Sequence, residues 1–257
     1  MGPTLADVET LARGAGEILR AGFGKHHQVR YKGAIDLVTE ADQDSEQYLL
    51  GEIQRRFPTH QVVTEESAGQ AGADCCQWII DPMDGTVNYA HGVPIFSVSI
   101  AYQEDGIIRL GAVYDPMLDE CFSAERGRGA WLNGQPVQPS QPLDLDHSLL
   151  VTGFAYDIRT NPRNNLDYYA TFALSSQGVR RLGSAAMDLC YVAAGRFDGY
   201  WELEIKPWDI AAGGLVAEEA GAVVTNVFGD RNYLTPPCSI LATSPAIHGE
   251  MLRILNQ

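Results

Sequence analysis

Two aspartates and a threonine occur together in the segment Asp81-Pro82-Met83-Asp84-Gly85-Thr86. Proline restricts the preceding residue to extended backbone, so we expect Asp81 to end a strand with its carboxylate at the sheet edge. Gly85 permits close backbone approach, and if a helical turn begins there, the amides of Gly85 and Thr86 can bind an anion. Two carboxylates repel an anion unless a cation lies between them. The segment therefore indicates metal-assisted chemistry on an anionic group.

Further acidic residues stand at the ends of other expected elements. Glu65 and Glu66 follow the strand expected at 62–64, and Asp209 lies at the start of an expected helix that is rich in small residues. A lone Asp-Gly is usually a solvated turn, and a lone acid at a helix start usually only stabilises the helix terminus. The recurrence of acids at element ends favours a shared site over these simpler interpretations.

Four segments of the chain together resemble the inositol monophosphatase family. They are Asp36-Leu37-Val38-Thr39-Glu40-Ala41-Asp42, Glu65-Glu66-Ser67, Trp78-Ile79-Ile80-Asp81-Pro82-Met83-Asp84-Gly85-Thr86-Val87-Asn88-Tyr89 and Trp208-Asp209-Ile210-Ala211-Ala212-Gly213, in the order and spacing of that family. The resemblance implies a layered αβαβα sandwich of the inositol monophosphatase and fructose-1,6-bisphosphatase type, with an α+β first half and an α/β second half. It also implies magnesium-dependent hydrolysis of a phosphate monoester.

The resemblance assigns roles to individual residues. It implies that the magnesium ligands are Glu65, Asp81, Asp84, Asp209 and the backbone carbonyl of Met83, with Asp81 between two ions. It implies that Glu65 and Thr86 orient the attacking water and that Asp84 belongs to the same catalytic centre. The implied substrate contacts are Asp84, Gly85, Thr86, Gly183, Ser184, Ala185 and Glu202. By itself, Glu202 would be interpreted equally well as a surface acid.

Elementary electrostatics supports cations at this centre. Two carboxylates about 4 Å apart repel each other by roughly 4 kcal/mol at an effective dielectric of about 20, so four converging acids require positive charge. Ligands that are all oxygen, with no histidine or cysteine, favour magnesium or manganese over zinc. We expect two or three Mg²⁺ ions, with Mn²⁺ as an alternative, that activate a water for in-line attack on phosphorus without a covalent enzyme intermediate.

The motifs identify the chemistry more closely than the substrate. Relatives that share this metal motif hydrolyse fructose 1,6-bisphosphate, 3′-phosphoadenosine 5′-phosphate or histidinol phosphate, so these stay open beside inositol-1-phosphate, which we expect first. The acidic composition and Glu202 favour a neutral polyol that carries one phosphate. Some bacterial relatives also act as transcription accessory factors through their surface, and a catalytically inactive magnesium-dependent structural protein is a third alternative.

Several other polar residues carry weaker signals. Lys32 lies in a segment similar to a mobile family loop near the metals, but a solvated lysine is the simpler interpretation. We expect Asp36 and Asp42 to brace that loop and cap the second helix, and the pair Arg180-Arg181 to lie at an interface. The histidines show no ligand spacing and the five cysteines no CxxC, so neither a zinc site nor a disulfide framework is expected.

Composition argues against other classes of function. The 257 residues include 18 Lys and Arg against 33 Asp and Glu, a formal net charge of −15, which makes direct binding to nucleic acid or anionic membranes unfavourable. No stretch approaches the ~18 consecutive apolar residues of a membrane span, and the N-terminal segment lacks the features of a secretory signal. We therefore expect a cytoplasmic protein. The family resemblance also implies that the protein is a homodimer and that lithium inhibits it.

The expected elements divide the chain into two domains, 1–145 with the main metal motif and 146–257 with Asp209 and the substrate contacts. Apolar residues at helical spacing predict a helix from Leu5 that ends near Gly22, and another from Ala41 to Phe57. Strands are expected at 62–64, 78–80, 96–103, 107–114 and 119–124, and the Asn133-Gly134 turn suggests an antiparallel sheet. After the proline-rich segment 136–142, strand and helix patterns alternate at 149–152, 166–174, 185–194, 197–201, 210–220, 222–225, 239–243 and 247–255.

Overall fold

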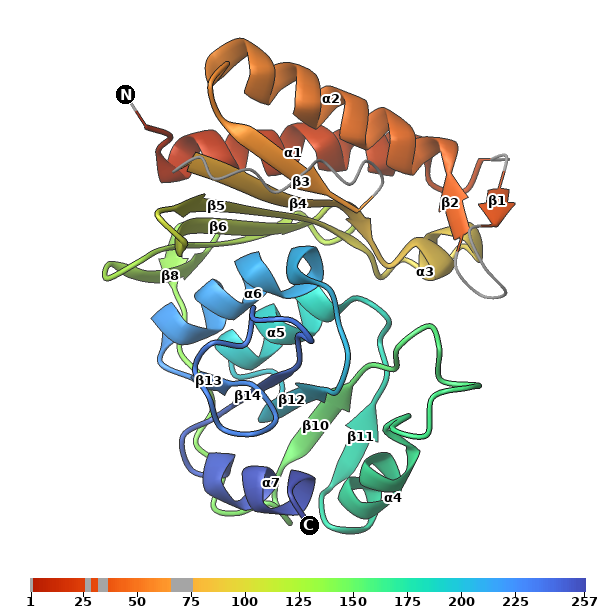
Figure 1. Cartoon of the computed structure of the whole chain (residues 1–257), viewed down its shortest axis with the longest axis vertical. Helices are drawn as coiled ribbons and strands as arrows, with labels where there is room; N and C mark the ends of the chain where they lie inside the picture. The colour runs from red at the N-terminus through yellow and green to blue at the C-terminus, as the bar shows by residue number, and fades with distance from the viewer. Residues whose placement is uncertain (1, 26–28, 32–36, 66–75) are drawn as a thin grey trace.

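The computed structural model describes residues 2–25, 29–31, 37–65 and 76–257, and Figure 1 shows their layers. Helices α1 (Leu5–Gly22) and α2 (Glu40–Arg56) cover the outer face of a seven-stranded sheet, and α5 (Ala185–Ala193) and α6 (Pro207–Ala220) lie below its inner face. A five-stranded sheet follows, with α4 (Leu166–Leu174) and α7 (His248–Leu255) on its far side. This order confirms the αβαβα architecture that the family resemblance implies.

The first two helices begin and end close to where the sequence indicates. At the start of α1, the Thr4 N–H donates to Asp7 Oδ2 at 2.9 Å and the Asp7 N–H donates to Thr4 Oγ1 at 3.3 Å. Thr39 and Asp42 form a second capping box at the start of α2, where the Thr39 N–H lies 2.8 Å from Asp42 Oδ2. Asp42 therefore caps α2, as expected. Lys32, Asp36, Glu66 and Cys75 lie outside the described residues.

The seven-stranded sheet has the order β3-β4-β5-β6-β7-β8-β9. Its strands are β3 (Gln61–Thr64), β4 (Cys76–Asp84), β5 (Ser97–Glu104), β6 (Ile107–Asp115), β7 (Glu120–Glu125), β8 (Gly129–Leu132) and β9 (Gln135–Pro136). Neighbours from β4 to β9 run antiparallel, as predicted, whereas β3 and β4 run parallel. The expectation that β4 ends at Asp81 is wrong: its pairing with β5 shifts between Asp81 and Asp84, because Pro82 has no N–H to donate and a bulge accommodates it.

The five-stranded sheet has the order β11-β10-β12-β14-β13. Its strands are β10 (Leu149–Thr152), β11 (Gly178–Arg180), β12 (Gly199–Glu202), β13 (Val223–Thr225) and β14 (Ile240–Thr243). β10 is parallel to β11 and β12, and β14 is antiparallel to β12 and β13. The three-residue strand β11 was not expected, because so short a segment shows no periodicity. The remaining short elements are β1 (Val29–Tyr31), β2 (Leu37–Thr39) and α3 (Thr86–Ala90).

Small residues let the middle helices pack closely. A Cβ added at Gly213 of α6 would lie 2.9 Å from Leu189 Cβ of α5, and one at Gly111 of β6 would lie 3.1 Å from the Ala212 carbonyl oxygen. The buried apolar cluster around these helices includes side chains from both sheets. The two sheets divide the chain between residues 136 and 149. A domain limit at residue 145 stays a prediction.

Two features bear on the environment of the protein. Within the described ranges, no helix combines the length and the apolar character needed to cross a lipid bilayer. Cys76, Cys121, Cys190 and Cys238 are free thiols.

Candidate active site

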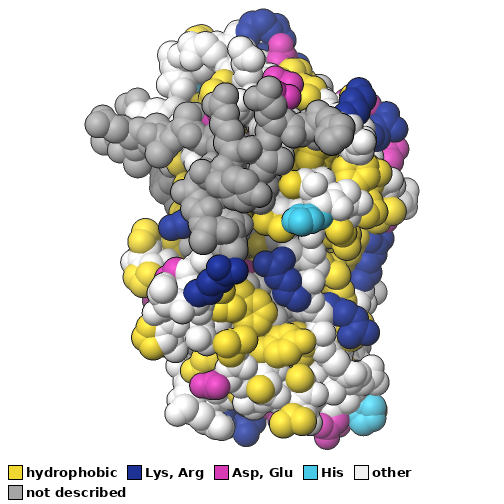
Figure 2. Space-filling model, turned by 90° about the vertical axis from the view of Figure 1, so that its right-hand side faces the viewer, with side chains coloured by type: hydrophobic (Ala, Val, Ile, Leu, Met, Phe, Trp, Pro, Cys, Tyr) yellow, Lys and Arg dark blue, Asp and Glu magenta, His cyan; other side chains and the backbone are white. Residues whose placement is uncertain are grey.

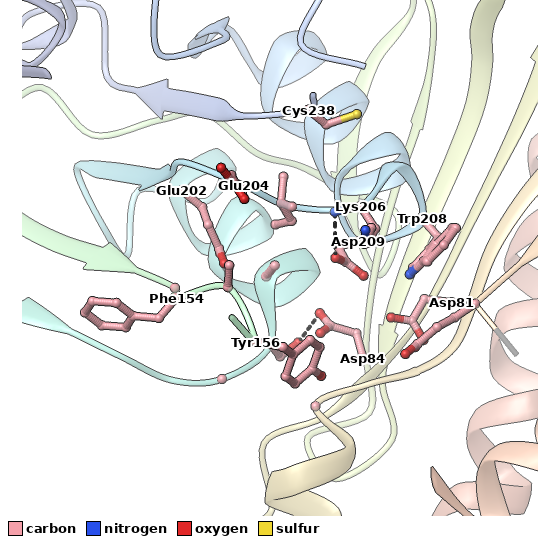
Figure 3. Close-up of a pocket in the computed structure, with 18 of the residues that line it drawn as sticks. Asp81, Asp84, Phe154, Tyr156, Glu202, Glu204, Lys206, Trp208, Asp209 and Cys238 are labelled. Atoms are coloured by element: carbon pink, nitrogen blue, oxygen red, sulfur yellow. Dashed lines mark hydrogen bonds between the residues drawn. The ribbon is translucent and has the colours of Figure 1, made fainter. Parts of the chain in front are cut away.

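A cavity of about 660 Å³ brings together residues from both halves of the chain. All residues proposed for the site from the sequence line it: Glu65, Asp81, Met83, Asp84, Gly85, Thr86, Gly183, Ser184, Ala185, Glu202 and Asp209. In Figure 3 the carboxylates of Asp81, Asp84 and Asp209 point toward one common space, and Glu202 comes from another side of the cavity. The chain therefore gathers side chains that are far apart in its sequence.

The parallel pairing of β3 and β4 brings Glu65 near Asp81. Thr64 and Ile80 form the last register pair of β3 and β4. The residues that follow them, Glu65 and Asp81, therefore lie at the same end of this pairing. Gly85 then turns the chain into α3 with a left-handed φ of 102°, and a Cβ there would lie 2.9 Å from the Ile95 carbonyl oxygen. Glycine is required for both reasons.

Helix α6 carries Asp209 to the same cavity. Pro207 occupies the first turn, where its missing N–H costs no helical hydrogen bond. Asp209 Oδ2 accepts the N–H of Lys206 at 3.1 Å, as drawn in Figure 3. The Trp208 carbonyl accepts the Ser99 hydroxyl at 3.1 Å, which ties the start of α6 to β5. The helix N-terminus favours a carboxylate at this position.

Burial and mutual repulsion raise the pKa of the clustered carboxyl groups. Asp81 is 2% exposed, and burial, followed by the charges of Glu65, Asp84 and Asp209, holds its pKa well above the usual range. Burial, followed by the charges of Asp84 and Glu65, raises the pKa of Asp209 in the same way. Burial also raises the pKa of Asp84 to about 6, against the effect of its hydrogen bonds. A cation among these groups would favour their ionised forms.

The donor set fits a hard divalent cation by its chemistry. It consists of carboxylate oxygens and the Met83 carbonyl, which are ligands that magnesium prefers. In the part of the chain that the structure describes, no group of three His, Cys, Asp or Glu side chains is arranged to hold a metal ion as it stands. The assignment therefore rests on the oxygen donors and on the raised pKa values, not on a preformed cage.

The Thr86 hydroxyl lies between two acceptors. It is 3.0 Å from Asp42 Oδ1 and 3.0 Å from the Met83 carbonyl oxygen. The sequence predicts a capping role for Asp42, and the structure adds this contact with Thr86. One oxygen of Asp42 caps α2 and the other reaches the turn after β4. No local sequence signal connects Asp42 to Thr86.

The start of α5 holds Asp84 on the other side of the cavity. The Ser184 hydroxyl and the Ala186 N–H both donate to Asp84 Oδ2 at 2.7 Å. In β12, the Tyr200 hydroxyl donates to Glu202 Oε2 at 2.6 Å. Glu202 is 7% exposed, so the surface-acid interpretation is wrong, and burial raises its pKa to about 7.

Other walls of the cavity were not predicted from the sequence. Arg181, which we expected at an interface, lines the cavity, and its charge opposes the rise in the pKa of Glu202. Its place two residues before Gly183 was the available signal. Lys206 adds a second positive side chain. The apolar and aromatic part of the wall includes Phe154, Ala155, Tyr156, Trp208, Pro236 and Pro237.

Comparison with known proteins agrees with this arrangement. The model of the inositol monophosphatase family matches residues 3–257. An inositol-1-monophosphatase of Synechocystis sp. is 46% identical over 254 residues, which cover 98% of this chain and 87% of that protein. Nus factor SuhB of Escherichia coli is 39% identical over 255 residues, 98% of this chain and 95% of that protein.

Solved structures give the same result. The inositol monophosphatase from Anabaena (Nostoc) sp. matches with a TM-score of 0.89 at 42% identity, over 98% of this chain and 95% of that chain. An inositol monophosphatase of Thermotoga maritima matches with a TM-score of 0.88 at 35% identity, over 96% and 94% of the two chains. In sequence and in fold, the chain belongs to the inositol monophosphatase family.

Proposed function

We propose that the protein is a magnesium-dependent phosphomonoesterase that hydrolyses a small polyol or sugar phosphate, with inositol-1-phosphate as the first candidate. The observation that carries the proposal is the gathering of Glu65, Asp81, Asp84 and Asp209 around one cavity, where burial and then mutual repulsion raise the pKa of Asp81 and Asp209. Membership of the inositol monophosphatase family supports the same chemistry.

The metal ligands would be the four acids and the Met83 carbonyl. Bound magnesium supplies Lewis acidity that activates water, neutralises charge on the phosphoryl group and stabilises the leaving alkoxide. Two or three ions are expected from the family resemblance, and Mn²⁺ suits the same oxygen ligands.

The chain's own groups orient the reacting atoms. The Thr86 hydroxyl can donate to Asp42, which leaves its oxygen free to accept a hydrogen bond from the attacking water. Glu65 accepts a second hydrogen bond from that water, so its direction of attack is fixed. The amides of Gly85 and Thr86 donate to phosphoryl oxygens.

The alcohol part of the substrate would extend toward Glu202 and the Gly183-Ser184-Ala185 segment, with Asp84 also in reach of a hydroxyl. A buried carboxylate that already accepts the Tyr200 hydroxyl is a suitable acceptor for substrate hydroxyl groups. Arg181 and Lys206 at the same cavity keep fructose 1,6-bisphosphate, 3′-phosphoadenosine 5′-phosphate and histidinol phosphate among the alternatives.

Phosphate release from this panel of four esters, with and without Mg²⁺, tests the proposal. We expect magnesium-dependent release, greatest with inositol-1-phosphate. The variants D84N and D209N should lose turnover and keep the circular dichroism of the folded protein. The matched control is D105N, which removes the same charge from an exposed turn where asparagine tolerates the φ of 51°. Release from none of the esters, or full activity in D84N, would contradict the proposal.

A second candidate function is a transcription accessory role. Relatives named Nus factor SuhB share 39% to 40% identity with this chain over 98% of its length. The net charge of −15 disfavours direct contact with nucleic acid, yet Lys and Arg side chains gather near the middle of the face in Figure 2. A gel-shift titration with RNA tests direct binding. If the protein surface and not the active site binds RNA, D84N should bind RNA with the affinity of the wild type.

We also propose a cytoplasmic location and, as the family resemblance implies, a homodimer that lithium inhibits. Sedimentation velocity measures the oligomeric state. Lithium titration of the phosphatase activity measures inhibition, and a monomer or an unaffected rate would remove the corresponding part of the proposal.

A further inference from the structure

Asp188 is a buried acid at the cavity with no role in the proposed reaction. It is the fourth residue of α5, it is 1% exposed, and it lines the cavity. Its buried Oδ1 atom has no hydrogen-bond partner. Among the described residues, Arg109 Nε and Ser244 Oγ share this condition, and neither residue lines the cavity.

Other acids that line the cavity, whether buried or partly buried, have protein donors. The start of α5 donates to Asp84, the Tyr200 hydroxyl donates to Glu202, and the Lys206 N–H donates to Asp209. A buried carboxyl oxygen without a donor is unfavourable, and such groups in native proteins generally have a partner. An unpartnered acid in the wall of a cavity therefore points to a ligand group that can donate a hydrogen bond.

The charges around Asp188 indicate which ligand group fits. Burial, followed by the charges of Asp84 and Glu202, raises the pKa of Asp188, and Arg181 opposes this rise. Neighbouring acids repel a phosphate or carboxylate group. A neutral hydroxyl can donate to a carboxylate and can accept from a protonated carboxyl group, so it suits either state of Asp188.

We propose that Asp188 and Glu202 together form a subsite that binds two neighbouring hydroxyl groups in the alcohol part of the substrate. This inference rests on the proposed function and narrows it to phosphate monoesters of polyols with adjacent hydroxyl groups. Asp188 is then a specificity-determining residue that contacts a substrate hydroxyl and takes no part in cleavage of the P–O bond.

The test compares D188A and D188N on inositol-1-phosphate, which has adjacent hydroxyl groups, and on p-nitrophenyl phosphate, which has none. We expect D188A to lower kcat/KM for inositol-1-phosphate roughly 10- to 100-fold, mainly by raising KM, because the loss of a hydrogen bond to a charged group weakens binding by about this factor. For p-nitrophenyl phosphate, kcat/KM should change less than about threefold. D188N keeps an acceptor and a donor of similar size, so it should retain more inositol-1-phosphate activity than D188A.

Asp115 offers a matched control. It is also a buried aspartate, 2% exposed, but it does not line the cavity, and its Oδ1 accepts the N–H groups of Met117 and Leu118. D115N should lower Tm and leave the ratio between the two substrates unchanged. If D188A lowers kcat/KM for both substrates equally, or for neither, Asp188 does not bind a substrate hydroxyl.

Binding of free myo-inositol, measured by saturation-transfer NMR, separates this inference from the proposed function. If the wild type hydrolyses no ester but binds inositol more tightly than D188A does, the proposed function fails and the subsite stands. If the wild type hydrolyses inositol-1-phosphate but both proteins bind inositol equally, the subsite fails and the phosphatase stands.

Discussion

Replacing Gly153 by alanine tests whether the position of Glu202 determines substrate binding. Gly153 follows β10, and a Cβ added there would lie 1.9 Å from Glu202 Oε2 and 2.5 Å from Glu202 Cδ. Both distances are too short for van der Waals contact, so the Glu202 side chain must move. The atoms in conflict are at the flexible end of a side chain, so we expect the fold to survive and the carboxylate to be displaced.

The displacement has two measurable costs. It breaks the 2.6 Å hydrogen bond from the Tyr200 hydroxyl, and Tyr200 is 0% exposed. A buried hydroxyl without a partner costs about 1 to 3 kcal/mol, and each kcal/mol lowers Tm by about 2 to 4 °C in a protein of this size. A charge-assisted hydrogen bond from Glu202 to a substrate hydroxyl is worth about 2 kcal/mol, so its loss should raise KM roughly 30-fold with kcat unchanged.

Steady-state kinetics on inositol-1-phosphate and p-nitrophenyl phosphate, with thermal denaturation, measure both effects. Gly51 of α2 provides the control, because a Cβ there would have no heavy atom within 4 Å. G51A should keep the wild-type KM and gain about 0.5 to 1 kcal/mol of helix stability. If G153A keeps the wild-type KM for inositol-1-phosphate, or weakens both substrates equally, the role given to Glu202 is wrong.

Three further predictions follow from the same geometry. T86V should lower kcat about 100-fold and T86S much less, because the hydroxyl orients the attacking water; phosphate release with saturating Mg²⁺ measures this. Burial raises the pKa of Glu202 to about 7, so KM for inositol-1-phosphate should fall as pH rises through that value and the carboxylate ionises, and in E202Q it should not. Carboxyl groups whose pKa is raised on folding stabilise the protein at low pH, and this contribution is lost as pH rises through the folded pKa, which is about 6 for Asp84 and about 7 for Glu202. The Tm of the metal-free protein should therefore fall between about pH 4.5 and 7, and Mg²⁺ should raise Tm more at pH 7 than at pH 5. Thermal denaturation in EDTA and in Mg²⁺ measures both effects. A Tm that does not change with pH in EDTA, or a larger effect of Mg²⁺ at about pH 5 than at about pH 7, would contradict this prediction.

Local signals were enough to predict much of the fold. The capping boxes Thr4-Asp7 and Thr39-Asp42 and the apolar face of α1 depend on residues within a few positions of one another, so the sequence alone locates both helices. The continuation of β4 past Pro82 could not be predicted in this way. It depends on the pairing of Asp84 with Ser97 of the neighbouring strand, which no local pattern specifies.

In the candidate site, too, local motifs could be predicted from the sequence and contacts between distant residues could not. The residues proposed from motifs share one cavity because each motif lies at the end of a strand or the start of a helix, and these ends converge. The contact between Asp42 and Thr86 joins residues 44 positions apart. The contact of Glu202 with Gly153 depends on the parallel pairing of β10 with β12. Such contacts arise from the packing of layers, so sequence spacing does not contain them.

The same packing explains how the clustered aspartates remain directed at the cavity in spite of their repulsion. In each of three aspartates, one carboxylate oxygen is held by a nearby donor: the Met83 N–H for Asp81, the Lys206 N–H for Asp209, and the start of α5 for Asp84. Because these donors belong to the backbone or to a helix start, they fix the direction of each carboxylate while its second oxygen is available to a ligand. A cation then gains from groups that are already oriented, and a fold whose interior acids are unfavourable by themselves becomes more stable when that cation binds.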